Sequence, residues 1–246
     1  MRRIRLTIAY DGTGFHGWQV QPGQPTIQGE LEAVLGRLEG APVKVHGSGR
    51  TDAGVHALAQ VAAFSFTNPM PIENLRQAIN RLLPVEIRIL AVEEAAAAFQ
   101  PRFDAVAKTY EYRIWREEIC PPFERRYVHH HPYPVDEAAM MRLAPLLEGE
   151  HDFGAFAAAD DRYEAGQSTV RTIFSSTLWR EGPRLIYRVR GSGFLKHMVR
   201  NIVGTLVQGG KGNVSAAGLE RLLGSPFGKC GATAPASGLF LVSVEY

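Results

Sequence analysis

In the first hundred residues, the hydrophobic patterns predict two strands in direct succession between two helices. Alternating apolar and polar residues predict strands, whereas apolar residues three and four apart predict helices. Thr26 is a candidate N-cap for one helix, and Pro71 opens the other. The predicted strands cover residues 3–10, 58–66 and 85–92, and a further strand begins at 43–45 and runs into a Gly-rich loop at 47–54. The predicted helices cover 27–39 and 71–83. The order β-α-β-β-α-β is typical of ferredoxin-like folds, and the adjacent strands exclude a doubly wound α/β sheet.

The second half of the chain predicts a looser mixture of strands and helices. Glu181-Gly182-Pro183 predicts a turn between two strands, and Gly149 ends a predicted helix. Strands are predicted over 106–115, 170–180, 184–192 and 239–245, helices over 136–148, 195–208 and 215–223, and loop-rich segments over 118–134 and 157–168. We therefore expect an α+β fold of two lobes with largely antiparallel sheets, residues 1–104 and residues 105–246.

The composition excludes several classes of protein. Of the 246 residues 45% are hydrophobic, yet no apolar run approaches the ~20 residues that a membrane helix requires. The N-terminus has no apolar signal region, and Cys120 and Cys230 belong to no C-x-x-C pair. These features predict a protein of the reducing cytoplasm, without a membrane anchor or a disulfide framework.

The charge is unevenly distributed along the second half. Residues 105–170 carry 7 basic and 12 acidic side chains, whereas residues 171–246 carry 10 basic and 3 acidic ones. Such asymmetry is typical of a surface that binds a polyanion. A solvated charged face without a partner would give the same pattern, so the charge alone leaves both interpretations open.

A Gly-rich loop at residues 47–54 offers the clearest candidate for chemistry. Its glycines allow tight turns that would bring Asp52 to an accessible surface. Arg50, two residues away, would favour the ionised carboxylate that a nucleophile or base requires. The alternative is that Asp52 makes an Asx turn and Arg50 is solvated.

Two further segments combine basic and apolar side chains. Lys108, Tyr110 and Tyr112 share one face of a predicted strand, where a tyrosine could stack on a base or belong to the sheet core. In the predicted helix 195–208, Lys196, His197 and Arg200 could form one basic edge beside the apolar residues. A plain amphipathic helix with solvated basic residues is the alternative.

The sequence offers little for a metal or a cofactor. His129, His130 and His131 are consecutive, so they would point in different directions on a regular element. No nucleophile elbow and no G-x-G-x-x-G after a strand are present. We therefore expect an enzyme, if this is one, to use acidic, basic and tyrosine side chains without a metal and without a cofactor.

The segment from Arg50 to His56, followed by Gln60-Val61, has distinctive companions along nearly the whole chain. They are Tyr10-Asp11-Gly12, Gly17-Trp18-Gln19, Asn80, Leu83-Pro84, Arg102-Phe103, Lys108-Thr109-Tyr110, His151-Asp152-Phe153, Phe194-Leu195, the run from His197 to Gly204, Ala234-Pro235 and Gly238-Leu239. Together these segments closely resemble the TruA family of tRNA pseudouridine synthases, in the family's order. Gln100 stands where many relatives have histidine, and Ala59 where glycine is common.

The resemblance implies two α+β lobes with RNA-binding-motif-like sheets and a basic cleft between them. It also implies isomerisation of uridine to pseudouridine at positions 38–40 of the tRNA anticodon stem-loop, without metal or cofactor. The expected partners are tRNA and a second copy of the chain in a homodimer. The reacting atoms are inaccessible inside a stacked stem, so the target base must flip out.

The resemblance also assigns roles to individual residues. Asp52 resembles the catalytic aspartate, acting as a nucleophile or removing the C2′ proton. Tyr110 resembles the active-site tyrosine, and Arg200 resembles the basic partner of the catalytic carboxylate. Expected RNA or base contacts come from Arg50, Lys108, Leu195, Lys196 and His197.

Two other functions compete with this interpretation. A non-catalytic RNA-binding protein on the same fold would bind tRNA and leave uridine unchanged. A glycoside hydrolase would normally need two carboxylates flanking the bond, and only Asp11 accompanies Asp52 as a candidate.

Overall fold

We describe the protein from a computed structural model, which describes residues 1–158, 167–224 and 231–246. Backbone contacts divide the chain into two units, Met1–Val106 with Phe240–Tyr246, and Ala107–Leu239. The predicted boundary near residue 104 and this division differ at the C-terminus, because the last seven residues belong with the first unit. Most of the predicted 157–168 loop lies outside the described residues. Cys230 also lies outside them.

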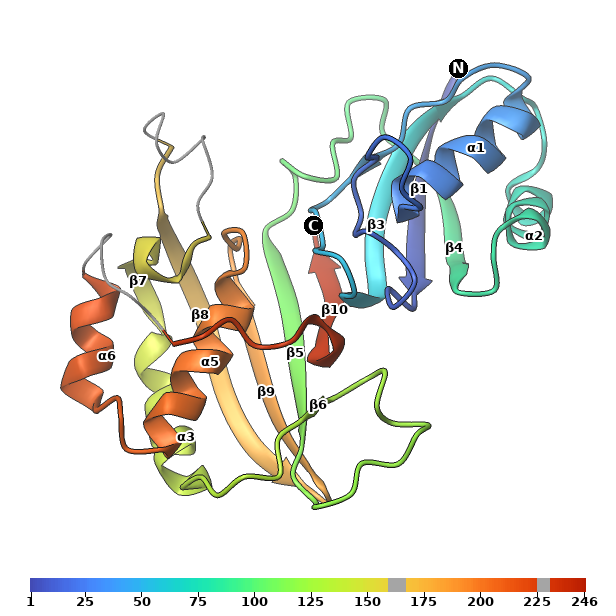
Figure 1. Ribbon diagram of the computed structural model, residues 1–246. Coiled ribbons are helices and arrows are strands. Elements are labelled where there is room, and N and C mark those ends of the chain that lie inside the picture. The colour runs from blue at the N-terminus through green and yellow to red at the C-terminus, as the bar shows by residue number, and fades with distance from the viewer. Residues whose placement is uncertain (159–166, 225–230) are drawn as a thin grey trace. The chain divides into compact units, whose positions relative to one another are not determined.

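The first unit is a sheet with two helices on one side. Its elements are β1 (Arg2–Tyr10), α1 (Ile27–Glu39), β2 (His46–Gly47), β3 (His56–Phe66), α2 (Ile72–Leu82), β4 (Ile87–Ala95) and β10 (Leu239–Glu245). The strand order is β4-β1-β3-β10, with β2 also paired to β3. The helices α1 and α2 contact each other, so they cover the same face (Figure 1).

Alternation along β1 determines the core of this unit. Ile4, Leu6 and Ile8 are completely buried, as are Leu31 of α1 and Leu75 of α2. Burying each such side chain stabilises the fold by about 1.5–3 kcal/mol. The helix α1 starts where the sequence predicts, because the hydroxyl of Thr26 accepts a hydrogen bond from the Gly29 N–H at 3.2 Å.

The strand predicted to begin at residues 43–45 begins only at His46. The N–H of Val45 donates to Glu32 Oε1 at 3.0 Å, and its carbonyl accepts from Gln28 Nε2 at 3.2 Å. The backbone of Val45 is therefore bonded to side chains of α1 rather than to a neighbouring strand. Pairing with β3 begins only at His46 and is limited to β2.

The second unit is also a sheet whose helices gather on one side (Figure 1). Its strands are β5 (Ala107–Trp115), β6 (His129–His130), β7 (Gly149–Asp152), β8 (Val170–Glu181) and β9 (Arg184–Gly191). Its α-helices are α3 (Glu137–Leu143), α5 (Met198–Gly210) and α6 (Ala216–Leu223), and short 3₁₀ turns cover Ala144–Leu147, Gly154–Phe156 and Ala236–Gly238. The strand order is β5-β9-β8-β7, and the short β6 pairs with β5.

The predicted helix over 136–148 is wrong in its second half. The α-helix ends at Leu143 and continues as a 3₁₀ turn, because Pro145 has no N–H for an α-helical hydrogen bond. Gly149 starts β7 instead of ending a helix. The largely antiparallel pairing is confirmed, since among the strand pairs described within each unit only β3–β10 and β5–β6 are parallel.

The last strand joins the first unit through β3. Phe240 and Leu241 pair with His56 and Ala57, and the ring of Phe240 stacks on that of His56 with 4.7 Å between centroids. The choice of a strand's partner is a non-local property, which the pattern of residues 239–245 does not contain.

Candidate active site

Asp52 lies in the loop between β2 and β3, and the residue before it is fixed by two hydrogen bonds. The buried Thr51 shares a hydroxyl–hydroxyl hydrogen bond of 2.8 Å with Tyr10, and its carbonyl accepts from the Trp18 N–H at 3.0 Å. After it, the Val55 N–H donates to the Asp52 carbonyl at 3.2 Å. Asp52 itself is half-buried, whereas Arg50 is exposed.

Two glycines allow the segment after β1 to approach this loop closely. A Cβ atom on Gly12 would lie 2.1 Å from the Val55 carbonyl oxygen, and one on Gly17 would lie 2.6 Å from that of Thr51. Gly17 also has φ +88°, which L side chains rarely adopt. The chain segment that contains Gly12 and Gly17 therefore packs against the Asp52 loop and supports it from one side.

A buried hydrogen-bond network supports the other side of the loop. Ser48 donates through its hydroxyl to Gln60 Oε1 at 2.6 Å, and Gln60 Nε2 donates to the Gly49 carbonyl at 3.1 Å. Both residues are completely buried. In the sequence, the only sign of this network is that both residues are polar and lie in or near a Gly-rich loop. The family resemblance includes Gln60, but no sequence feature marks Ser48 as a supporting residue.

In the second unit, Tyr110 and Tyr112 lie on the same side of β5 but have different surroundings. Tyr110 is 8% exposed, and its ring meets that of Phe194 edge-on, with 5.0 Å between centroids. Tyr112 is completely buried and donates to the Pro235 carbonyl at 2.8 Å. Burial raises the pKa of Tyr112 far above its ordinary value, against the opposing effect of the Arg200 charge. Tyr112 is therefore a core residue. Lys108, the third predicted member of this face, is half-buried.

The predicted helix over 195–208 begins three residues later than expected. Its N-cap, His197, has φ +61°, so the α-helix α5 starts at Met198. Leu195 is 5% exposed, and Lys196 is exposed ahead of the helix. The expected helical edge of Lys196, His197 and Arg200 is therefore wrong, because only Arg200 lies on the helix.

Arg200 is held by the segment that follows residue 230. Its Nε donates to the Ala234 carbonyl at 2.7 Å, and the Ala234 N–H donates to the Arg200 carbonyl at 3.2 Å. The buried Asn201 accepts from the hydroxyl of Thr233 at 2.6 Å. A Cβ atom on Gly204 would lie 1.8 Å from the Ala232 carbonyl oxygen, so glycine is needed for this approach.

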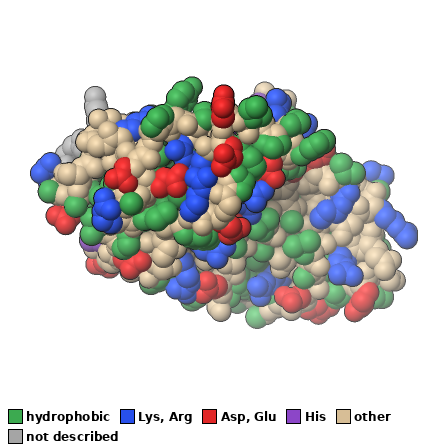
Figure 2. Space-filling view, turned by 90° about the horizontal axis from the view of Figure 1, so that it is seen from below, with side chains coloured by type: hydrophobic (Ala, Val, Ile, Leu, Met, Phe, Trp, Pro, Cys, Tyr) green, Lys and Arg blue, Asp and Glu red, His purple; other side chains and the backbone are tan. Residues whose placement is uncertain are grey.

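Part of the charge asymmetry in the second half of the chain is accounted for by ion pairs within the protein. Several arginines of residues 171–246 form ion pairs with glutamates of residues 105–170: Arg180 with Glu117 and Glu137, Arg184 with Glu124, and Arg188 with Glu111. Burial opposes ionisation of Glu111, but hydrogen bonds from Arg188 and Arg113 outweigh it and lower the pKa. On the face in Figure 2, lysine and arginine side chains are interspersed with acidic ones rather than gathered in one block.

The histidine run packs locally. His129 and His131 lie on the same side of the chain, with ring centroids 5.6 Å apart, and His129 meets Tyr112 edge-on. Among the described residues, no group of three or more histidine, cysteine, aspartate or glutamate side chains could hold a metal ion. In the same part of the chain, no helix is long and apolar enough to cross a membrane.

Comparison with known proteins identifies the family. A family model described as tRNA pseudouridine synthase matches residues 6–104 and 143–246. The tRNA pseudouridine synthase A of Solibacter usitatus (strain Ellin6076) is 68% identical over 246 residues, covering 100% of both chains. The chain belongs to the tRNA pseudouridine synthase family. Two proteins of that same name are 44% identical over 100% of this chain, covering 100% of the Brevibacillus brevis protein and 95% of the Geobacillus kaustophilus protein.

The predicted site residues are divided between the two units. Asp52 and Arg50 belong to the first unit, and the other six to the second. Lys108 and Tyr110 lie in residues 105–142, between the two ranges that the family model matches, although the relatives align through them. The remaining six lie inside the matched ranges.

Proposed function

We propose that this protein isomerises uridine to pseudouridine in tRNA, with Asp52 as the catalytic carboxylate. Membership of the tRNA pseudouridine synthase family supports the reaction and the substrate class. The observation that carries the role of Asp52 is its position on a loop fixed from both sides by buried hydrogen bonds. Catalytic groups require such rigid support, because small displacements are costly.

The reaction exchanges one glycosidic bond for another within the same nucleoside. The N1–C1′ bond breaks, the uracil turns, and C5 bonds to C1′ while the C5 proton is released and N1 gains a proton. Asp52 either attacks C1′ as a nucleophile or removes the C2′ proton. A flipped-out uridine is required in both cases, because a stacked base hides these atoms.

The second unit supplies the other proposed groups. Arg200 is proposed to pair with the Asp52 carboxylate, and its guanidinium is oriented by the Ala234 carbonyl. Tyr110 is proposed to stack on the target base, with Leu195 lining the base pocket. Arg50, Lys108, Lys196 and His197 are proposed to contact the RNA. These roles require both units to contact the same nucleotide.

The finer features of the proposal come from the family resemblance. They are targets at positions 38–40 of the anticodon stem-loop, a homodimer, catalysis without metal or cofactor, and a cytoplasmic location. We also infer a ferredoxin-like first lobe and a second lobe, with the boundary near residue 104, and a cleft between the lobes. The order β4-β1-β3 with β2 paired to β3 supports the first of these.

Product analysis tests the proposal. Unmodified tRNA incubated with the protein should yield pseudouridine at positions 38–40, detected by carbodiimide labelling and primer extension, with no free uracil. Free uracil would indicate a hydrolase, and bound but unchanged tRNA would indicate a binding protein; either result would contradict the proposal.

A further inference from the structure

Three arginines surround a groove in the first unit that none of the roles above uses. The groove lies between α2 and β4 and has a volume of about 620 Å³. Arg76, Asn80 and Arg81 come from α2, and Arg88 comes from β4. None of the side chains that line it is acidic.

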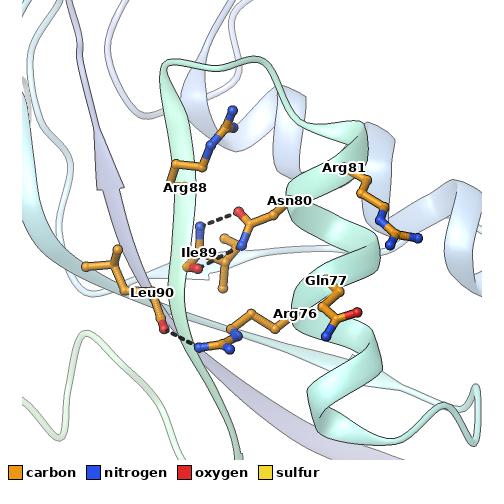
Figure 3. Close-up of a pocket in the computed structure, with 7 residues that line it drawn as sticks. All are labelled: Arg76, Gln77, Asn80, Arg81, Arg88, Ile89 and Leu90. Carbon is orange, nitrogen blue, oxygen red and sulfur yellow. Dashed lines mark hydrogen bonds between the residues drawn. The ribbon is translucent and has the colours of Figure 1, made fainter.

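Side chains of α2 occupy the free backbone of β4, which ends the strand order of this unit. Asn80 pairs with Ile89 in both directions, accepting from its N–H at 2.8 Å and donating to its carbonyl at 2.9 Å (Figure 3). Arg76 donates to the Leu90 carbonyl at 3.3 Å. An edge strand can pair with another strand, but these bonds occupy the edge of β4, so a ligand of this groove would have to bind side chains.

The guanidinium groups around the groove retain donors for such a ligand. Arg76 and Arg81 are exposed, and no hydrogen bond or ion pair to the rest of the described chain involves Arg81. In Figure 3 its side chain extends from α2 away from β4. Arg88 is fixed by bonds from one nitrogen to the Pro84 and Ile87 carbonyls, at 2.7 and 2.6 Å. A guanidinium has five N–H donors, and its planar fork matches phosphate oxygens.

The sheet register places the groove at the same end of the first unit as the Asp52 loop. Ile87 of β4 lies opposite Tyr10 of β1, and Tyr10 lies opposite Ala57 of β3 while its hydroxyl bonds Thr51. The lateral separation of β4 from β3 is two strand spacings, about 10 Å. A single RNA strand with one nucleotide at Asp52 can reach that far.

We propose that this arginine groove binds backbone phosphates of the tRNA beside the target nucleotide. The proposal rests on the proposed function for its ligand, and it adds a contact surface to the residues assigned there. Phosphate contacts release counterions, so each should contribute about 0.7–0.9 to the slope of log affinity against log salt.

Replacing the arginines by glutamine tests the groove. The R76Q/R81Q double variant should bind tRNA about tenfold more weakly at physiological salt, and the slope of log affinity against log salt should be less steep by about 1.4–1.8. The single variant R81Q should show about half of that slope change, and it breaks no bond within the described chain. The matched control is R37Q, which also removes an exposed arginine from the last turn of a helix of this unit.

The readouts are filter binding of tRNA between 50 and 300 mM salt and phosphate-ethylation interference. We expect at least one phosphate whose ethylation weakens binding by the wild type and R37Q but not by R76Q/R81Q. Affinities and slopes equal to the wild type, or an equal loss in R37Q, would overturn the proposal. Absence of pseudouridine formation by the wild type would instead contradict the proposed function, while the binding comparison would still decide on the groove.

Discussion

The position of Asp52 is determined by the residues on either side of it. Burial raises the pKa of Tyr10 to about 12, against the opposing hydrogen bonds of Thr51 and Gln60. The Tyr10 hydroxyl therefore keeps its proton at neutral pH and remains a partner for Thr51.

Asp11 adds an Asx turn, accepting from the Thr13 N–H at 3.0 Å, so it has a local structural role as well. The hydrolase alternative would need it as a second catalytic carboxylate.

His129 should make stability depend on pH. Burial first, and then the charges of His131, His130, Arg116 and Lys211, lower its pKa from 6.5 to about 4. Between these values the unfolded chain binds a proton that the folded chain does not, so stability is full above pH 6.5 and falls towards pH 4. This group should remove at most about 3 kcal/mol.

Urea unfolding at pH 7, 6, 5 and 4.5 measures this effect. The H129Q variant should lose much of the slope and keep the part due to His131 and His46, whose pKa values burial also lowers. A slope in H129Q equal to that of the wild type would contradict this assignment.

The segment between β1 and α1 acts as a support for the Asp52 loop, and G17A should reveal this. The alanine would have to adopt φ +88° and would press on the Thr51 carbonyl. We expect a loss of about 1–3 kcal/mol in the free energy of unfolding and a fall in kcat of about 100-fold, because the carboxylate is displaced.

Gly14, three residues earlier, provides the matched control. A Cβ atom there meets nothing within 4 Å and the backbone needs no positive φ, so G14A should change stability by less than about 0.5 kcal/mol. Single-turnover kinetics and urea unfolding of both variants measure the two effects. Wild-type turnover in G17A would show that the close approach of the two segments is dispensable.

Across the whole molecule, the sequence predicts what is local and misses what is not. The strands β1, β8 and β9 and the helix α1 follow from periodicity and capping, because those signals lie within each segment. The late start of α5 depends on the left-handed conformation of His197. The sequence does not predict this conformation, because the residue is not a glycine.

The sequence also does not predict which segments contact one another in the folded protein. The pairing of β10 with β3 and the ion pairs between the acidic and basic halves of the second unit join residues far apart in the chain. Of the site, the Asp52 loop was visible in the residues as a glycine pattern, but its catalytic role came only from the family resemblance. The arginine groove had no local signal, because Arg76 and Arg88 come from different elements.

The most direct test of the central claim is tritium release from tRNA labelled at uridine C5, measured for the wild type and Asp52→Asn together. C5 loses its hydrogen only when it becomes the glycosidic carbon. We predict release by the wild type, and from D52N a rate lower by at least about 10⁴-fold with tRNA binding retained, since one carboxylate carries the essential step. Release by D52N near the wild-type rate would contradict the catalytic role of Asp52, and no release by the wild type would contradict the isomerase itself.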